Sequence, residues 1–236
     1  MADQVKFAAA RRHFLRQGGA LAAAAALLGP AQLLAAEPTK TAAIDVTPTE
    51  DLMREHGVLR RLMLTFDEFA KRLQGAAEFS PALITQAAKI IRTFIQDYHE
   101  KDEEAAIFPR FVQAGKLTDL VKVLMAQHQA GRRLIATLET SAQADLKDPA
   151  ARQQVSGLLG SFNRMYRPHA AWEDTVLYPA FRTVISPKEF EVLGDQFEDK
   201  EQKLFGKDGF EKIVAEVAGL EKQLGLGDLS RFTPKV

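Results

Sequence analysis

The chain has 236 residues, of which 46% are hydrophobic and 26% are charged, and its formal net charge at pH 7 is zero. This composition is typical of a folded globular protein, and the length suits one large domain or two small ones. A neutral chain lacks the basic excess of nucleic-acid-binding proteins, so we expect no nucleic-acid partner. Because there is no cysteine, disulfides and thiolate metal sites are excluded, and nitrogen and oxygen ligands must hold any metal.

The first 36 residues have the organisation of an export signal peptide. A basic stretch at Arg11–Arg16 is followed by an Ala- and Leu-rich run, and small residues stand at its end. The adjacent arginines resemble a twin-arginine signal, which directs folded proteins to the twin-arginine export machinery, although Ala10 stands where Ser or Thr is usual. We therefore expect cleavage near residues 35–37 and a periplasmic or otherwise exported protein. An uncleaved N-terminal membrane anchor is the alternative.

Helix signals follow in order after a short polar linker over residues 37–47. Thr47-Pro48-Thr49-Glu50 is a capping box, and the apolar residues after it recur at three- and four-residue spacing as far as Gly75. Ser186-Pro187-Lys188-Glu189 has the same pattern. No segment alternates with period two, so we expect no strands. The expected helices cover about residues 48–74, 81–114, 117–138, 149–184, 187 onward, and 209–224.

Four long helices with short links predict an all-α fold, an up-and-down four-helix bundle over residues 48–184. Residues 185–236 then form a C-terminal helical extension of one or two helices. The bundle is the part of the chain in which the sequence repeats itself.

The repeat consists of two copies of a helical hairpin. Residues 99–111 read HEKDEEAAIFPRF and residues 169–181 read HAAWEDTVLYPAF, with the same His-x-x-x-Glu start and the same proline position. The segment around His56 recurs in the same way around His128. Each hairpin therefore brings one His on its first helix and His-x-x-x-Glu on its second. Every histidine that follows the signal stands at one of these repeated positions.

This spacing is typical of a metal site. Residues i and i+4 share a helix face, so the His and Glu of each second helix can reach one point. Hydrogen-bonded core histidines, or histidines on the surface, are the alternative. If the four histidines and two glutamates of the repeat gather in a core, their charges need partners, because a desolvated carboxylate without a partner costs several kcal/mol. Two divalent cations would satisfy all six. The six are His56, His99, Glu103, His128, His169 and Glu173.

These residues, with Ile107-Phe108-Pro109 and Leu177-Tyr178-Pro179 after them, resemble the hemerythrin-like HHE cation-binding domains over about residues 48–184. The resemblance implies that Glu103 and Glu173 bridge two metals and that the four histidines are terminal ligands. It implies two iron ions with an oxo or hydroxo bridge. Manganese and zinc also suit imidazole and carboxylate ligands and remain alternatives.

The chain departs from the oxygen-carrying members of this family. They have a second His where this chain has Arg132, and their fourth-helix acid comes one residue later than Glu173. One metal is therefore expected to lack a nitrogen ligand, and water, Glu100 or an open position would fill the gap. We expect Glu104 and Asp174 to be solvated or to hydrogen-bond to ligands rather than to ligate.

Three further side chains stand next to the expected ligands. Tyr166 and Trp172 flank His169 at i−3 and i+3, and they either pack in the core or donate hydrogen bonds to bound oxygen species. Arg132 is either surface charge or a salt-bridge partner of a ligand carboxylate.

The sequence thus favours an exported non-haem di-iron protein that binds and reduces a small oxidant. O₂, hydrogen peroxide and nitric oxide are the candidate substrates, which would make it a peroxide- or NO-consuming oxidoreductase. The alternatives are a non-catalytic module that binds or stores O₂ or iron, and a structural metal site. An open coordination position distinguishes a reactive metal from a structural one.

Overall fold

The computed structural model describes residues 46–75 and 79–235, and all the regular structure in these residues is helical. The predicted all-α fold is therefore confirmed for this part of the chain. The predicted export signal (residues 1–36) and almost all of the predicted linker (37–47) lie outside the described residues. None of the described helices combines the length and the apolar character that crossing a membrane requires.

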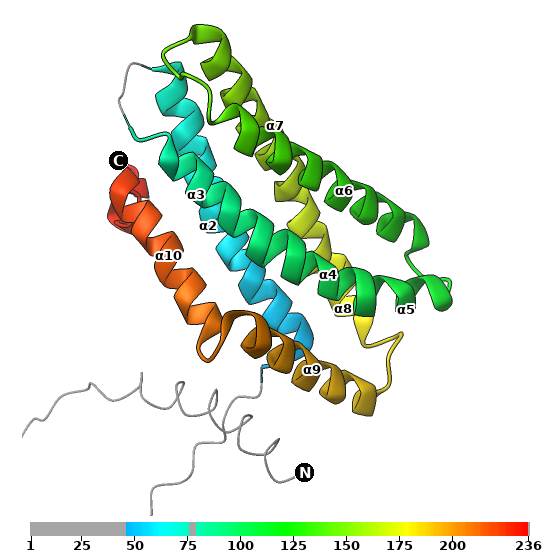
Figure 1. The fold of residues 1–236 in the computed structure, drawn as a ribbon. Coiled ribbons are helices and arrows are strands. Elements are labelled where there is room, and N and C mark those ends of the chain that lie inside the picture. The colour runs from blue at the N-terminus through cyan, green and yellow to red at the C-terminus, as the bar shows by residue number, and fades with distance from the viewer. Residues whose placement is uncertain (1–45, 76–78, 236) are drawn as a thin grey trace, which may run out of the picture. The chain divides into compact units, whose positions relative to one another are not determined.

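Four helical arms form the bundle, and two further helices follow (Figure 1). The first arm is α2 (Pro48–Gln74) and the third is α6 (Thr118–Ser141). The second arm joins α3 (Ala82–Ile90), η1 (Ile91–His99), α4 (Glu100–Asp102), η2 (Glu103–Ile107) and α5 (Phe108–Gln113). The fourth joins α7 (Pro149–Trp172), η3 (Glu173–Leu177) and α8 (Tyr178–Phe181). The C-terminal elements are α9 (Pro187–Phe205), α10 (Gly209–Leu224) and the 3₁₀ turn η4 (Leu229–Phe232).

Both predicted capping boxes are present and begin α2 and α9. The Thr47 hydroxyl accepts from the Glu50 backbone N–H at 3.4 Å, and the Glu50 carboxylate accepts from the Thr47 N–H at 2.9 Å. Ser186 and Glu189 exchange the equivalent bonds at 3.3 and 3.1 Å. Each box satisfies N–H groups that a helix start otherwise leaves without partners.

The second and fourth arms contain π-helical segments, which the sequence pattern did not indicate. In η2 the Phe108 N–H bonds to the Glu103 carbonyl, and in η3 the Tyr178 N–H bonds to the Glu173 carbonyl. Both bonds span five residues instead of four. A proline follows each of them, and a proline ring clashes with the carbonyl four residues earlier in a regular α-helix. The wider turn relieves this clash, and it begins at the glutamate of each repeat.

The apolar core is divided into two clusters along the bundle. One contains residues from 58–73 of α2, 84–98 of the second arm and 155–170 of α7. The other contains Leu52 together with residues 107–111, 121–124 and 177–197. On each arm, the histidine or glutamate of the repeat lies at the boundary between the two clusters. The bundle therefore carries a polar layer between two apolar ones.

The C-terminal helices pack on the first two arms (Figure 1). Helix α10 lies along α2 and α3, where the Arg61 guanidinium pairs with Glu221 and Arg72 donates to the Leu224 carbonyl at 2.8 Å. Helix α9 packs on α2. One outer face of the first hairpin is thereby covered by the extension.

Helices α6 and α7 approach closely where Gly131 meets Tyr166. A Cβ on Gly131 would lie 2.0 Å from the Tyr166 hydroxyl oxygen, so only glycine leaves room for this tyrosine. The close approach holds the Tyr166 hydroxyl beside the polar layer.

Gly131→Ala is therefore expected to destabilise the protein by about 1–3 kcal/mol, because the tyrosine or the two helices must move. Urea unfolding measures this change. Gly160→Ala is the matched control, because nothing lies within 4 Å of the added Cβ. The control should be neutral or stabilising by up to about 1 kcal/mol. Equal stability of the two variants would mean that Tyr166 is not confined by Gly131.

Candidate metal centre

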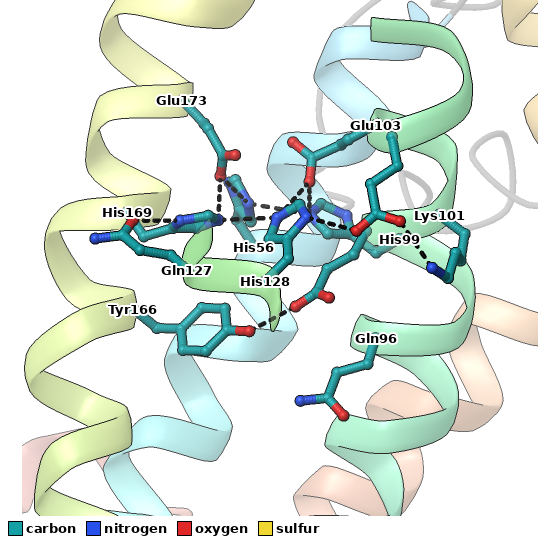
Figure 2. Close-up of polar contacts among 12 residues, drawn as sticks. His56, Gln96, His99, Lys101, Glu103, Gln127, His128, Tyr166, His169 and Glu173 are labelled. Carbon is teal, nitrogen blue, oxygen red and sulfur yellow. Dashed lines mark hydrogen bonds and ion pairs between the residues drawn. The ribbon is translucent and has the colours of Figure 1, made fainter. Parts of the chain in front are cut away.

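Four buried imidazoles meet at the centre of the bundle, one from each arm (Figure 2). His56 comes from α2, His99 from η1, His128 from α6 and His169 from α7. The Nε2 atoms of His56 and His99 are 3.1 Å apart, and those of His128 and His169 are 3.2 Å apart. Each hairpin thus contributes one pair of imidazoles whose Nε2 atoms face each other.

The two glutamates of the repeat connect these pairs. Glu103 Oε2 lies 3.6 Å from His99 Nε2 in its own hairpin and 3.4 Å from His128 Nε2 in the other. Glu173 Oε2 lies 3.1 Å from His169 Nε2 and 3.3 Å from His56 Nε2. Each carboxylate therefore faces one imidazole of each pair. Figure 2 shows both glutamates on the same side of the imidazoles.

The arrangement leaves buried oxygens without hydrogen bonds. Glu103 and Glu173 are both 0% exposed, and neither Oε2 atom has a partner in hydrogen-bonding geometry. Glu173 Oε1 also lacks one. Unpaired carboxylate oxygens in a core are costly unless a cation compensates them. Ligand atoms of His56, His99 and Glu103 lie within 4.8 Å of one another, as do those of His128, His169 and Glu173. The six residues therefore fit two cations.

The outer nitrogen of every imidazole has its own partner. His56 Nδ1 lies 2.7 Å from Asp174 Oδ1, and His128 Nδ1 lies 3.1 Å from Glu104 Oε1. These two acids come from the opposite hairpin. They hydrogen-bond to histidines, as we expected, although Glu104 also groups with Glu100 and His128 closely enough for a cation. An acceptor at Nδ1 places the proton there and leaves Nε2 with a lone pair for a metal.

The sequence analysis missed the partners of the other two imidazoles. His99 Nδ1 lies 2.7 Å from Glu55 Oε2, and His169 Nδ1 lies 2.9 Å from Gln127 Oε1. Both partners belong to the same hairpin as their histidine. A signal was present in the sequence, since Glu55 and Gln127 directly precede His56 and His128 at equivalent repeat positions.

The two halves differ in the aromatic residue that follows each glutamate. Tyr178 stacks on His56 and its hydroxyl donates to Glu103 Oε1 at 2.7 Å. Phe108, its repeat equivalent, stacks on His128 and has no hydroxyl to donate. This difference explains why Glu173 Oε1 lacks a partner while Glu103 Oε1 has one.

Glu100 is buried beside the imidazoles and held by two side chains. The Tyr166 hydroxyl donates to Glu100 Oε1 at 2.5 Å, and Arg132 Nη2 lies 2.7 Å from Glu100 Oε2. The same guanidinium bonds to Glu104 Oε1 at 2.7 Å. Of the alternatives left open for Arg132 and Tyr166, the structure has both side chains in contact with the buried Glu100. Trp172 is not buried at the centre, because it is 54% exposed to solvent.

The carboxylates change the protonation of the imidazoles. Burial lowers the pKa of His56, but its hydrogen bond to Asp174 and the nearby Glu173 carboxylate outweigh this and raise the pKa to about 9. Burial likewise lowers the pKa of His128, and its hydrogen bond to Glu104 with the nearby Glu103 carboxylate raises it to about 10. His99 differs, because burial lowers its pKa below the ordinary value.

Comparisons with known proteins agree with this geometry. The family model described as the hemerythrin HHE cation binding domain matches residues 47–181 and again residues 119–202, the second match beginning with the second hairpin. Three relatives, described as uncharacterized proteins, are 42% identical to this chain over 234 residues. One is from Mycobacterium bovis and two are from strains of Mycobacterium tuberculosis. The matches cover 96% of this chain and 92% of each relative. No solved structure matches the chain significantly.

Metal binding at pH 7 should release about two protons per chain. His56 and His128 are protonated in the metal-free protein below pH 9, and a metal ligand must be a neutral imidazole. Each metal displaces one proton, so the affinity for each metal should rise by up to about tenfold per pH unit between pH 7 and 8. Isothermal titration with zinc in buffers of different ionisation enthalpy measures the protons released. An enthalpy that does not depend on the buffer would show that both imidazoles are already neutral.

Proposed function

Because the chain belongs to the hemerythrin HHE cation-binding family, whose domains bind metal ions in a helical bundle, we propose that it is a non-haem di-iron protein that binds and reduces a small oxidant. The observation that carries the proposal is the pair of glutamates, each of which faces one imidazole from each hairpin. A site for a single metal would require only one pair of facing imidazoles, whereas this layer contains two pairs.

In this proposal the four imidazoles and two glutamates would hold two metals. His56 and His99 would bind one metal, His128 and His169 would bind the other, and Glu103 and Glu173 would be shared between them. The bonds at Nδ1 orient all four rings before the metals arrive, which lowers the entropic cost of binding. When bound, the metals supply Lewis acidity and electrons for the reduction of the oxidant.

One metal would keep a position for the oxidant. Arg132 stands where oxygen-carrying family members have a histidine, and a guanidinium stays protonated and cannot ligate. It binds Glu100 and Glu104 instead. Glu100 thus remains a candidate ligand that Arg132 and Tyr166 hold next to the centre, and water or oxidant is the alternative occupant.

Hydrogen-bond donors gather on the Glu100 side of the imidazoles. Figure 2 shows Tyr166 and Gln96 together on this side. The Gln96 side-chain nitrogen and Arg132 Nε are both buried without hydrogen-bond partners. Unpaired donors in a core can bind an oxygen-containing molecule such as peroxide. O₂, hydrogen peroxide and nitric oxide remain the candidate oxidants, and we place their binding on this side.

Two non-catalytic functions compete with this one. A module that binds or stores O₂ or iron would contain the same ligands without turnover. A structural metal site would have no exchangeable position. The export signal expected over residues 1–36 would add that the protein acts in the periplasm, with its metals loaded before export.

Glu103→Ala and Glu173→Ala should each reduce the metal content from about two ions per chain to one or none. The stabilisation that metal provides should fall with it, measured as the difference in Tm with and without a chelator. Glu191→Ala, which removes an exposed acid on α9, is the control and should keep both ions. If either bridging variant retained two metals, the assignment of its carboxylate as a bridge would be wrong.

The proposed activity is tested on anaerobically purified protein. Two irons per chain, with a near-ultraviolet oxo-bridge absorption after oxidation, are expected. Catalytic loss of peroxide or nitric oxide would establish an enzyme, and reversible O₂ spectra without turnover would favour the binding module. Zinc alone, with no spectral change on addition of oxidant, would overturn the proposal.

A further inference from the structure

Helix α9 covers one outer face of the first hairpin. Asp51 and Glu55 of α2 lie there with Glu201 of α9, one carboxylate oxygen of each within 4.8 Å of the other two. Asp102 of the second arm pairs with Lys200 of α9 at 2.5 Å. Both arms of the first hairpin therefore contribute to the face that α9 closes.

The second hairpin has the same face without a covering helix. Val123 and Trp172 stand at the repeat positions of Asp51 and Asp102. They are 53% and 54% exposed, whereas the two acids are 4% and 6% exposed. The extension packs on α2 and α3, and Figure 1 shows α10 and α6 on opposite sides of the bundle. In the described part of the chain, the face between α6 and α7 is therefore open to solvent.

The open face is apolar at its centre. Ala126 and Ala130 follow Val123 by three and seven residues, and Pro168 precedes Trp172 by four, so all five lie on this face. Ala126 and Pro168 are exposed, and Ala130 is half-buried. Exposed apolar residues grouped in this way mark an interaction surface, and tryptophan is enriched among the residues that dominate protein–protein binding.

Opposite charges mark the two ends of the face on α6. Asp119 and Arg133 lie seven residues before and seven residues after Ala126, which is about two helical turns each way, so the three share one side of the helix. The Asp119 side chain is 93% exposed and pairs with Lys122 of its own helix at 3.1 Å. Arg133 is exposed, and among the described residues its guanidinium has no hydrogen-bond or ion-pair partner. An acid and a base are thus placed symmetrically about the apolar centre.

Trp172 lies near the level of that centre. Helices α6 and α7 run in opposite directions, and Gln127 contacts His169 across them at 2.9 Å. Ala126 directly precedes Gln127, and Trp172 follows His169 by three residues. Helical side chains lean towards the N-terminus of their helix, which for Trp172 is the direction of His169. The indole therefore lies close to the level of Ala126.

A second copy of the chain fits this layout. In an interface with a twofold axis the same face meets itself, so one apolar centre packs on the other. With the axis passing Ala126 and Trp172 at right angles to the helices, α6 of one copy lies antiparallel to α6 of the other. Asp119 of each copy then faces the partner's Arg133. A face of a single charge would instead repel its own copy.

We propose that the face formed by Val123, Ala126, Ala130, Pro168 and Trp172 is the interface of a homodimer. Asp119 pairs with the partner's Arg133 at both ends, and the partner covers on the second hairpin what α9 covers on the first. The inference goes beyond the proposed function and does not depend on it, because the interface contains none of the six residues assigned to the metals.

The oligomeric state of the full chain tests the interface, and Trp172 reports on it directly because it is the only tryptophan in the chain. Sedimentation equilibrium should give the mass of a dimer at about 100 µM and dissociation on dilution towards about 0.1 µM, the range of modest interfaces. Tryptophan emission should move to longer wavelength over the same dilution, since the indole becomes exposed to water as the copies separate.

Val123→Glu should weaken the dimer at least about tenfold, because each copy then places a carboxylate in the apolar contact. Trp172 remains in this variant as the reporter. The matched control is Val192→Glu, which changes a valine that is 46% exposed on α9. The control should dimerise as the unchanged protein does.

A charge reversal tests the antiparallel arrangement. Arg133→Asp should weaken the dimer at least about tenfold, since it places an acid opposite the partner's Asp119. Adding Asp119→Arg to the same chain should restore the affinity, because the pairing is then reversed at both ends. Failure of the double variant to recover would show that these two residues do not meet.

Three results would overturn the proposal. A monomer at about 100 µM with the emission of an exposed tryptophan would show that the face stays open at concentrations where modest interfaces form. A monomer with a shielded tryptophan would show that residues of the same chain outside the described part cover it. A dimer that dissociates without a change in emission, or that Val123→Glu leaves intact, would use a different face.

Discussion

Six ionisable side chains lie in one layer of an otherwise apolar bundle. Each of them needs a hydrogen bond or a partner of opposite charge, and the rest of the structure depends on meeting this need. Four imidazoles and two carboxylates lie between two hydrophobic clusters, almost without exposure to solvent. Hydrogen bonds satisfy the outer nitrogen of every ring, but buried oxygens of both glutamates have no such partner. The layer suits the cation-binding character of the family, because a metal would replace the imidazole protons as the partner of these oxygens.

Both copies of the repeat place the hydrogen-bond partners of the histidines at equivalent sequence positions. In each hairpin, the residue before the first histidine orients the second histidine, while the acid after the glutamate orients a histidine of the opposite hairpin. The two hairpins are thereby locked to each other through their ligand histidines. The π turns at Glu103 and Glu173 belong to the same pattern, since the prolines at 109 and 179 do not fit a regular helix.

Function is expected where the two halves differ. Glu100 corresponds to Ala170, and Tyr166 corresponds to Gln96, so only one side of the imidazoles carries a carboxylate held by a tyrosine and an arginine. Under the di-iron proposal, this is the side that handles the oxidant. On the outer face, acids of the first hairpin replace Val123 and Trp172, and α9 covers them.

The sequence by itself determined the helical fold, both capping boxes and the six residues that meet at the centre. Those follow from local rules: hydrophobic spacing, cap chemistry, and a His-x-x-x-Glu motif that shares a helix face. Only the tertiary structure decided the partners of Nδ1, the π turns, the surface position of Trp172 and the group formed by Asp51, Glu55 and Glu201. Glu55 and Gln127 could have been noticed from the repeat, but their contacts could not, since these join different helices. Glu201 had no signal at all, because its neighbours lie some 150 residues earlier and only the docking of α9 on α2 brings them together.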